Sequence, residues 1–189
     1  MNAEGFKHVA TALQKRLETA VNPALTVHVG PLDDQDASSA DLVLFLYRLA
    51  INPDLRNAGH LAPPKGAVAG VFYEDSIPFD LHFVLSASPS RRGQDIEGLA
   101  MLGAAVQALF GTPDLTAAGF PEETMRLSLE SVATDELGRI WSLFPTINYR
   151  TSILFLATPV WIDPAQQGLV VAPVVGQDMS DIQPIFGPH

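Results

Sequence analysis

Three stretches of the chain repeat apolar residues every three or four positions, which is the spacing of an amphipathic helix. The first covers residues 6–21 and ends at Asn22-Pro23. The second starts at Asp95 and is expected to direct one apolar face to a sheet, a face made of Ile96, Leu99, Leu102, Gly103, Val106, Leu109 and Phe110. The third is short and follows Thr134, whose side chain is expected to cap it. The pattern therefore predicts three helices.

Five further stretches alternate apolar and polar residues, or are apolar throughout, as strands do. Residues 25–29 alternate, and residues 42–50 are apolar enough to predict a central strand that is buried on both faces. The other three are residues 79–87, 125–129 and 149–162. Between the second and third of these strands, residues 52–78 hold many prolines and glycines and predict a long irregular connection. Connections of that length are usually functional or become ordered against a partner.

These elements predict an α+β fold in which a mostly antiparallel sheet is covered by helices. We expect one domain over residues 1–163, followed by an extended C-terminal arm over residues 164–189. The arm carries a group of apolar side chains that need burial, namely Leu169, Val170, Val171, Val174 and Val175. They could be buried in their own subunit as an edge strand, or on a neighbour by strand addition. We favour the neighbour, because an arm that follows the last core strand can reach it.

The composition narrows the class of protein. The 189 residues are 47% hydrophobic and 17% charged, which favours a well-packed domain that associates with other subunits. The net charge of −10 has the wrong sign for a nucleic-acid-binding surface. The chain contains no cysteine, which excludes disulfides, thiolate zinc sites and cysteine nucleophiles.

Neither a targeting segment nor a membrane span is expected. The first 20 residues are interrupted by charges and lack the apolar run of a signal peptide. The most apolar later stretch, residues 152–162, is too short to cross a bilayer and contains Pro159. These features predict a cytoplasmic protein that does not insert into a membrane.

The sequence offers little catalytic chemistry. It lacks the phosphate-binding, nucleophile-elbow, zinc-protease and EF-hand motifs, so we expect no catalytic residue, no cofactor and no metal ligand. The best candidate pair is Asp80 and His82, which a strand places on one face and which His28 could extend to a metal site. A histidine in such an apolar run is more often a hydrogen-bonded core or interface residue, and we favour that interpretation.

Other conspicuous residues have simple structural explanations. Asp33, Asp34 and Asp36 lack the spacing of a calcium loop and are interpreted as a solvated acidic loop. Trp141 and Trp161 are interpreted as core aromatic residues. Tyr149 and Arg150 are candidates for an interface anchor, although Arg150 could equally form an internal ion pair.

Four blocks of the sequence carry a family resemblance, in the order of residues 44–57, 79–87, 98–115 and 141–163. Together they resemble the cap or tail-terminator proteins of contractile injection systems, which are phage-tail-like particles, and the resemblance extends over about residues 3–163. Residues 148–152 read Asn-Tyr-Arg-Thr-Ser where the family pattern is Pro-Tyr-Arg-x-Ser. The arm after Asp163 matches no motif of the family.

The resemblance implies a tail-terminator-like fold and a structural function. Such a protein forms a homo-hexameric ring that closes the distal end of the inner tube and sheath and so fixes the length of the particle. Its partners would be other copies of itself, the tube protein and the sheath protein, without a cofactor. The alternative is an enzyme or small-ligand-binding protein that uses the strand face of Asp80 and His82.

Overall fold

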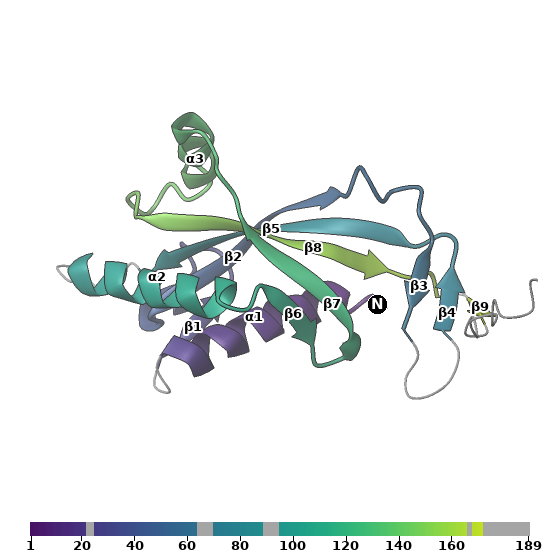
Figure 1. Cartoon of the computed structure of the whole chain (residues 1–189). Helices are drawn as coiled ribbons and strands as arrows, with labels where there is room; N and C mark the ends of the chain where they lie inside the picture. Colours follow the sequence, from purple (N-terminus) through teal and green to yellow (C-terminus); the bar gives the residue numbers. More distant parts are fainter. Residues whose placement is uncertain (22–24, 64–69, 89–94, 166–167, 172–189) are drawn as a thin grey trace, which may run out of the picture.

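The computed structural model describes residues 1–21, 25–63, 70–88, 95–165 and 168–171. In this part of the chain three helices accompany two sheets (Figure 1). The helices are α1 (Gly5–Val21), α2 (Asp95–Phe110) and α3 (Thr134–Trp141), with a short 3₁₀ helix at Asp36–Ser39. No helix in these ranges is both long and apolar enough to cross a membrane.

The larger sheet has six strands in the order β1-β2-β5-β8-β7-β6. Their bounds are β1 Val27–Val29, β2 Leu42–Ile51, β5 Ile77–Ala87, β6 Asp114–Ala117, β7 Phe120–Leu129 and β8 Ser152–Ile162. All neighbouring strands are antiparallel except β1 and β2. The smaller sheet has the order β3-β4-β9, with β3 His60–Ala62, β4 Gly70–Tyr73 and β9 Leu169–Val171. The predicted α+β class, with a mostly antiparallel sheet covered by helices, is confirmed.

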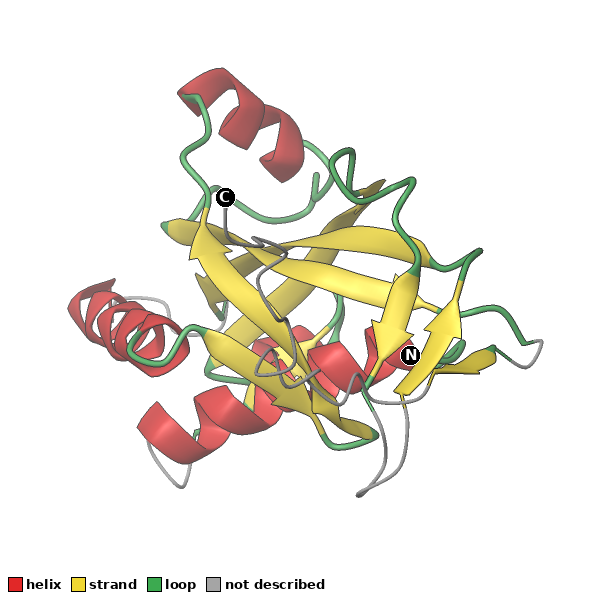
Figure 2. Ribbon diagram, turned by 45° about the vertical axis from the view of Figure 1, so that its right-hand side comes forward, coloured by secondary structure: helices red, strands yellow, loops and turns green. Residues whose placement is uncertain are grey.

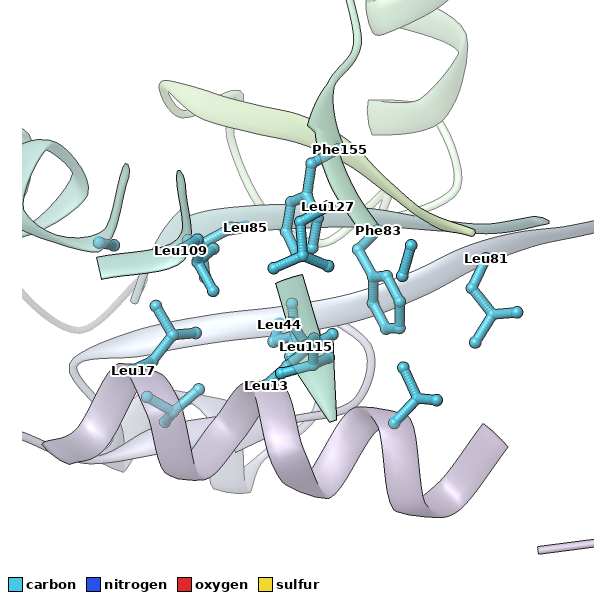
Figure 3. Close-up of a cluster of buried hydrophobic side chains, with 14 of the residues drawn as sticks. Leu13, Leu17, Leu44, Leu81, Phe83, Leu85, Leu109, Leu115, Leu127 and Phe155 are labelled. Carbon is cyan, nitrogen blue, oxygen red and sulfur yellow. The ribbon is translucent and has the colours of Figure 1, made fainter. Parts of the chain in front are cut away.

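Helices cover both faces of the larger sheet. Helices α1 and α2 lie on one face and α3 lies on the other (Figures 1 and 2). The first layer encloses the main core, in which Leu13 and Leu17 of α1 meet Phe83 and Phe155 of the central strands (Figure 3). The second layer is smaller and packs Trp141 and Phe144 against β2 and β5. Trp141 is therefore a core residue, as predicted.

Helix α2 covers the sheet with a different face from the one we expected. Leu102, Ala105 and Leu109 are buried, whereas Ile96 and Leu99 are 85% and 53% exposed. Gly103, also assigned to the packed face, has open space beside it. The helix is apolar on nearly every side, so its periodicity could not identify which stripe packs.

Strand β2 is not central, because β5 and β8 occupy the middle of the sheet. Its first residues, Leu42–Leu44, pair with β1 and are buried, but β1 ends there and Arg48, Leu49 and Ile51 are exposed. The pairing with β5 also shifts between Leu46 and Arg48, where β2 contains one extra residue and forms a bulge. The prediction of a strand buried on both faces is thus wrong for its second half.

Several other predictions also need correction. Residues 52–78 are not wholly irregular, since β3 and β4 lie within them. Thr134 is the first helical residue of α3 rather than its cap, and Ala133 occupies the cap position without a side-chain hydrogen bond. The last long strand begins at Ser152, not at residue 149.

The described end of the arm forms a strand within its own subunit. Val171, Val170 and Leu169 pair with Gly70, Val71 and Phe72 of β4. This differs from the strand addition to a neighbour that the sequence leads us to favour. Because β8 ends beside Ile77, which follows β4 closely in the chain, the arm begins near the edge of β4. Val174 and Val175 lie outside the described residues, and the boundary at residue 163 stays a prediction.

Candidate interaction surface

Asp80 and His82 do not form a pair, because each has a different partner inside the fold. Asp80 Oδ1 accepts hydrogen bonds from Asn52 Nδ2 at 2.9 Å and from Thr158 Oγ1 at 2.5 Å. His82 Nδ1 lies 2.9 Å from Glu130 Oε1. Both side chains are half-buried. Asp80 thus connects β5 to the neighbouring strand β8, whereas His82 connects β5 to the residue that follows β7. Both contacts agree with the structural interpretation of His82.

Glu130 also accepts a hydrogen bond from the hydroxyl of Tyr47, at 3.3 Å. Burial of the phenol, together with the nearby charge of Glu130, raises the pKa of Tyr47 to about 12. Tyr47 thus stays a neutral donor at physiological pH. Since His82 binds the other oxygen of the same carboxylate, both oxygens of Glu130 are occupied by the fold.

The sequence also raised the possibility of a metal site that includes His28. Strand β1, which carries His28, is separated from β5 by β2, so His28 does not join His82. Its Nε2 lies 3.4 Å from Asp34 Oδ2 instead. Within the described ranges, no group of three or more histidine, aspartate or glutamate side chains could hold a metal ion.

Tyr149 and Arg150 differ in their surroundings. Tyr149 is 60% exposed and its ring meets the edge of Trp141, with centroids 5.2 Å apart. Arg150 is half-buried and donates from Nη1 to the backbone oxygen of Ser88 at 3.1 Å. The fold thus uses Arg150 internally, whereas Tyr149 presents an aromatic surface to solvent.

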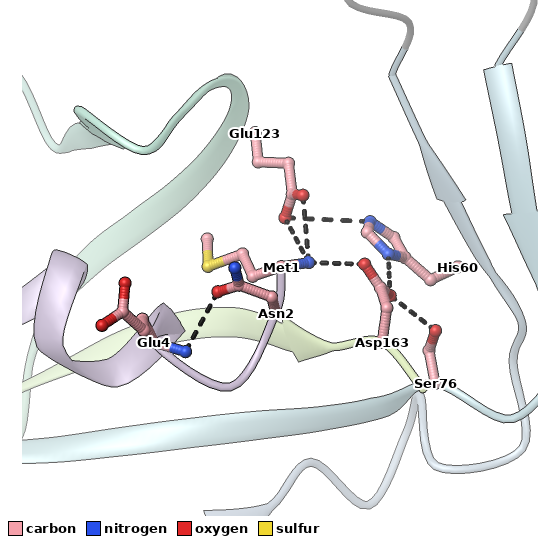
Figure 4. Close-up of polar contacts among 7 residues, drawn as sticks. All are labelled: Met1, Asn2, Glu4, His60, Ser76, Glu123 and Asp163. Carbon is pink, nitrogen blue, oxygen red and sulfur yellow. Dashed lines mark hydrogen bonds and ion pairs between the residues drawn. The ribbon is translucent and has the colours of Figure 1, made fainter. Parts of the chain in front are cut away.

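The most extensive polar cluster was not anticipated from the sequence. It joins the N-terminal amine of Met1, His60, Ser76, Glu123 and Asp163 (Figure 4). Asp163 is its centre: Oδ2 accepts from the amine of Met1 at 2.5 Å, and Oδ1 lies 2.6 Å from both His60 Nδ1 and Ser76 Oγ. The side chains of His60, Glu123 and Asp163 are 8%, 12% and 11% exposed.

The environment of Asp163 keeps it ionised. Burial alone would raise the pKa of Asp163, but the hydrogen bonds from His60, the N-terminal amine and Ser76 outweigh burial and lower it to about 2. Although serine, histidine and aspartate meet here, they do not form a hydrolytic triad. Ser76 and His60 both bind Oδ1 of the carboxylate, so the imidazole of His60 contacts Asp163 rather than the hydroxyl of Ser76.

The cluster, which we call the Asp163 cluster, connects the two sheets. His60 begins β3 of the small sheet, Ser76 lies between β4 and β5, Glu123 is on β7 and Asp163 follows β8. The ring of His60 also stacks on Trp161 of β8, with centroids 4.8 Å apart and planes 5° apart. No sequence motif could have revealed this cluster, because up to 162 residues separate the partners.

The small sheet presents apolar side chains to solvent. In β9, Leu169, Val170 and Val171 are 69%, 74% and 40% exposed, and Leu61 of β3 is 57% exposed. The pairing of β9 with β4 therefore satisfies backbone groups without burying these side chains. The small sheet is the part of the described surface where the arm residues predicted as interface candidates gather.

Comparison with known proteins identifies the family. Residues 8–175 match the family model of the Pvc16 N-terminal domain. The chain belongs to the Pvc16 N-terminal domain family. No curated protein matches it.

Two solved structures share the fold of this Pvc16 N-terminal domain protein. One is the sheath/tube terminator of the extracellular contractile injection system PVC in its extended state, with 16% identity, a TM-score of 0.62 and coverage of 97% of this chain. The other is the tube-terminating cap of the anti-feeding prophage, with 19% identity, a TM-score of 0.61 and coverage of 91% of this chain. The matches span 65% and 60% of those two longer chains. The resemblance to tail terminators is confirmed.

Proposed function

We propose that this protein is the cap, or tail terminator, of a contractile injection system. In this role it closes the distal end of the inner tube and sheath as a homo-hexameric ring and halts their polymerisation. The observation that carries the proposal is the family match over residues 8–175, and two terminators of such systems share the fold. Its partners would be the tube protein, the sheath protein and its own copies, in a cytoplasmic assembly without nucleic acid.

The surface of the chain suits a subunit with several protein partners. Exposed apolar residues occur on α2, where Ile96 and Leu99 lie, and on the small sheet, where Leu169 and Val170 lie. Closing a ring requires two different surfaces on each subunit, and a cap needs a third surface that meets the end of the tube. Tyr149, Leu169, Val170 and Val171 remain our candidates for such contacts, together with Val174 and Val175. Arg150 would act indirectly, by holding residue 149 in place.

A structural cap requires no catalytic residue and no cofactor. The rival function, an enzyme or ligand-binding protein that uses Asp80 and His82, receives no support from their geometry, since each contacts a partner within the fold.

The oligomeric state tests the proposal directly. Native mass spectrometry of the full chain at micromolar concentration should give a hexamer, either alone or after addition of tube protein. Electron microscopy should then show rings at one end of the tubes and shorter tubes at higher cap concentration. A chain that stays monomeric with tube protein present, and leaves tube length unchanged, would refute the proposed function.

A further inference from the structure

A groove of about 490 Å³ lies between α1 and the edge strand β6. One wall is made of α1 side chains, including Thr11, Lys15 and Thr19, and the other is made of residues 115–118. Figure 1 shows α1 running alongside β6 at the lower margin of the sheet. The β6 wall is partly apolar, because it includes the buried residues Leu115 and Ala117.

The β6 wall offers backbone groups to this groove. Leu127 N donates to Pro113 O at 2.8 Å, so residues 113 and 115 direct their backbone groups toward β7. In an antiparallel pair the alternate residues, here Asp114 and Thr116, direct theirs away from the partner strand. Arg16 Nη2 accordingly donates to Asp114 O at 2.6 Å on the groove side. Among the described residues β6 is the last strand of the sheet, so the amide of Thr116 faces the groove and has no strand partner there.

The groove also carries a lysine in an otherwise acidic protein. Arg16 is bound to the carbonyl oxygens of Thr112 and Asp114, and His8 lies 3.6 Å from Glu4. Asp114, the nearest carboxylate on β6, lies 3.8 Å from Arg126. Lys15 is exposed and forms no ion pair with any described residue. An ammonium group beside an outward amide is a suitable place for a carboxylate.

The chain itself contains a surface that complements this groove. We call residues 32–36 the acidic turn: Asp33, Asp34 and Asp36 are exposed, while Leu32 is buried beneath α3. Asp34 N donates to Pro31 O, and Asp36 N donates to Asp34 Oδ1, so the turn is already ordered before it meets a partner. Ordering in advance lowers the entropy cost of binding.

The acidic turn and the groove belong to opposite sides of the sheet. The turn packs with α3, whereas the groove is formed by α1, which lies on the other face (Figure 2). Contact between them thus requires two chains. Two different surfaces that join copies head to tail are the requirement for a closed ring.

We propose that the groove between α1 and β6 receives the acidic turn of a neighbouring copy, with Asp33 of that copy paired with Lys15. This inference rests on the proposed function, because it assigns one contact of the ring. The turn of each subunit enters the groove of the next, and the amide of Thr116 supplies a further hydrogen bond to the incoming carboxylates.

Charge reversal at the two positions tests the contact. Lys15→Glu and Asp33→Lys should each raise the dissociation constant between copies at least tenfold, because each places like charges together. The double variant restores opposite charges and should assemble like the wild type. Neither residue has an ion pair or side-chain hydrogen bond among the described residues, so circular dichroism should show intact folding.

Lys7→Glu is the matched control. Lys7 lies on the same helix, is 73% exposed and does not line the groove. Eight helical residues, or about 12 Å, separate it from Lys15, which exceeds the screening length at physiological salt. This variant should assemble normally. Equal loss in Lys7→Glu and Lys15→Glu, or failure of the double variant to recover, overturns the proposal.

Cysteine cross-linking separates this inference from the ring itself. The chain has no native cysteine, so Thr116→Cys with Asp33→Cys allows a short bis-maleimide to join only these positions. Covalent oligomers should form at high protein concentration, and Lys7→Cys with Asp33→Cys should give far fewer. Suppose that wild-type rings form but the pair at positions 116 and 33 gives no more cross-linked product than the pair at positions 7 and 33. The proposed groove contact is then wrong, while the proposed cap function is unaffected. If no rings form but the pair at positions 116 and 33 cross-links selectively, the groove contact is supported and the hexameric ring is not.

Discussion

The two sheets of this protein are stabilised by different forces. The six-stranded sheet encloses a core of leucine and phenylalanine side chains, of which Phe83 and Phe155 are fully buried. The three-stranded sheet has strands of only three or four residues and exposes Leu169 and Val170. Such a small sheet is not stable alone. It is attached to the larger one by the Asp163 cluster and by the stacking of His60 on Trp161.

The two sheets should therefore differ in how strongly their stability depends on pH. Apolar burial depends little on pH, whereas a cluster of charged groups depends on the protonation of each member. The larger sheet should therefore unfold only globally, and the small sheet should detach on its own when its charges change.

Truncating the main core should destabilise the whole protein. Leu85 is fully buried, so Leu85→Ala should lower the free energy of unfolding by about 2–5 kcal/mol. Leu99→Ala is the matched control, because Leu99 is 53% exposed and should cost less than about 0.5 kcal/mol in the unassembled chain. Urea denaturation of the two variants measures both values. Similar losses of unfolding free energy in the two variants would contradict the burial of Leu85 in the core.

Neutralising the centre of the Asp163 cluster should release the small sheet alone. Asp163→Asn removes the charge that binds His60 and the N-terminal amine, and should reduce local stability by about 2 kcal/mol. Hydrogen exchange should quicken in β3, β4 and β9 and stay slow in β5 and β8. The exposed neighbour Asp75 provides the control variant, Asp75→Asn, which should leave all these rates unchanged. Faster exchange throughout the molecule would contradict separate stabilisation of the sheets.

Acid should detach the small sheet before the core unfolds. Because the pKa of Asp163 falls from 3.8 to about 2 in the folded state, its contribution is complete above about pH 4 and is lost as the pH falls through 2. A shift of this size corresponds to about 2 kcal/mol. In a Trp141→Phe background, the fluorescence of Trp161 should report the change, since its ring stacks on His60. Adding Asp163→Asn should remove this transition, and its persistence would assign the acid effect to another group.

The hydrogen bonds of Tyr47 and His82 to Glu130 should contribute little to the stability of the protein. Tyr47→Phe removes the hydrogen bond to Glu130 and should lower the free energy of unfolding by about 1 kcal/mol. His82→Gln should have an effect of similar size, because it alters the other hydrogen bond to the same carboxylate. Thermal unfolding measures both. A loss of several kcal/mol in either variant would indicate a role beyond bridging strands.

Removing metal ions should leave the thermal stability of the protein unchanged. His82 is bound by Glu130 rather than by a metal site, so a chelator should leave the melting temperature unchanged in both sheets. Elemental analysis of the purified chain should find no stoichiometric transition metal. A marked fall in melting temperature with chelator would revive the metal-dependent alternative.

The sequence predicted the parts of this fold that depend on local patterns. Helix α1 alternates apolar and charged residues clearly, and it was located to within one residue of its observed start. Strands β5 and β8 were recognised from dense apolar runs. Helix α2 was located, but its packed face was misassigned because nearly every side is apolar.

The missed features depend on contacts between distant residues. Strands β3, β4 and β9 are too short to show a period, and β9 comes almost 100 residues after the strand it pairs with. The Asp163 cluster draws on five separate segments, of which each contributes one unremarkable polar group. Asp80 and His82 attracted notice because they are neighbours in sequence, yet their partners Thr158 and Glu130 are 78 and 48 residues away.

The bulge in β2 has a consequence for how copies of this protein meet. Beyond Leu44, the outer side of β2 has no strand beside it in the described part of the chain, and an open strand edge of this kind can nucleate fibrils. The extra residue at Tyr47 twists this edge, and the exposed Arg48 adds a charge that would be repelled by its own counterpart in a second edge. Both features oppose uncontrolled pairing between the β2 edges of different copies. The proposed function of this protein is to stop a polymer from growing. Its own sheet thus contains features that oppose polymerisation of the protein through its strand edges.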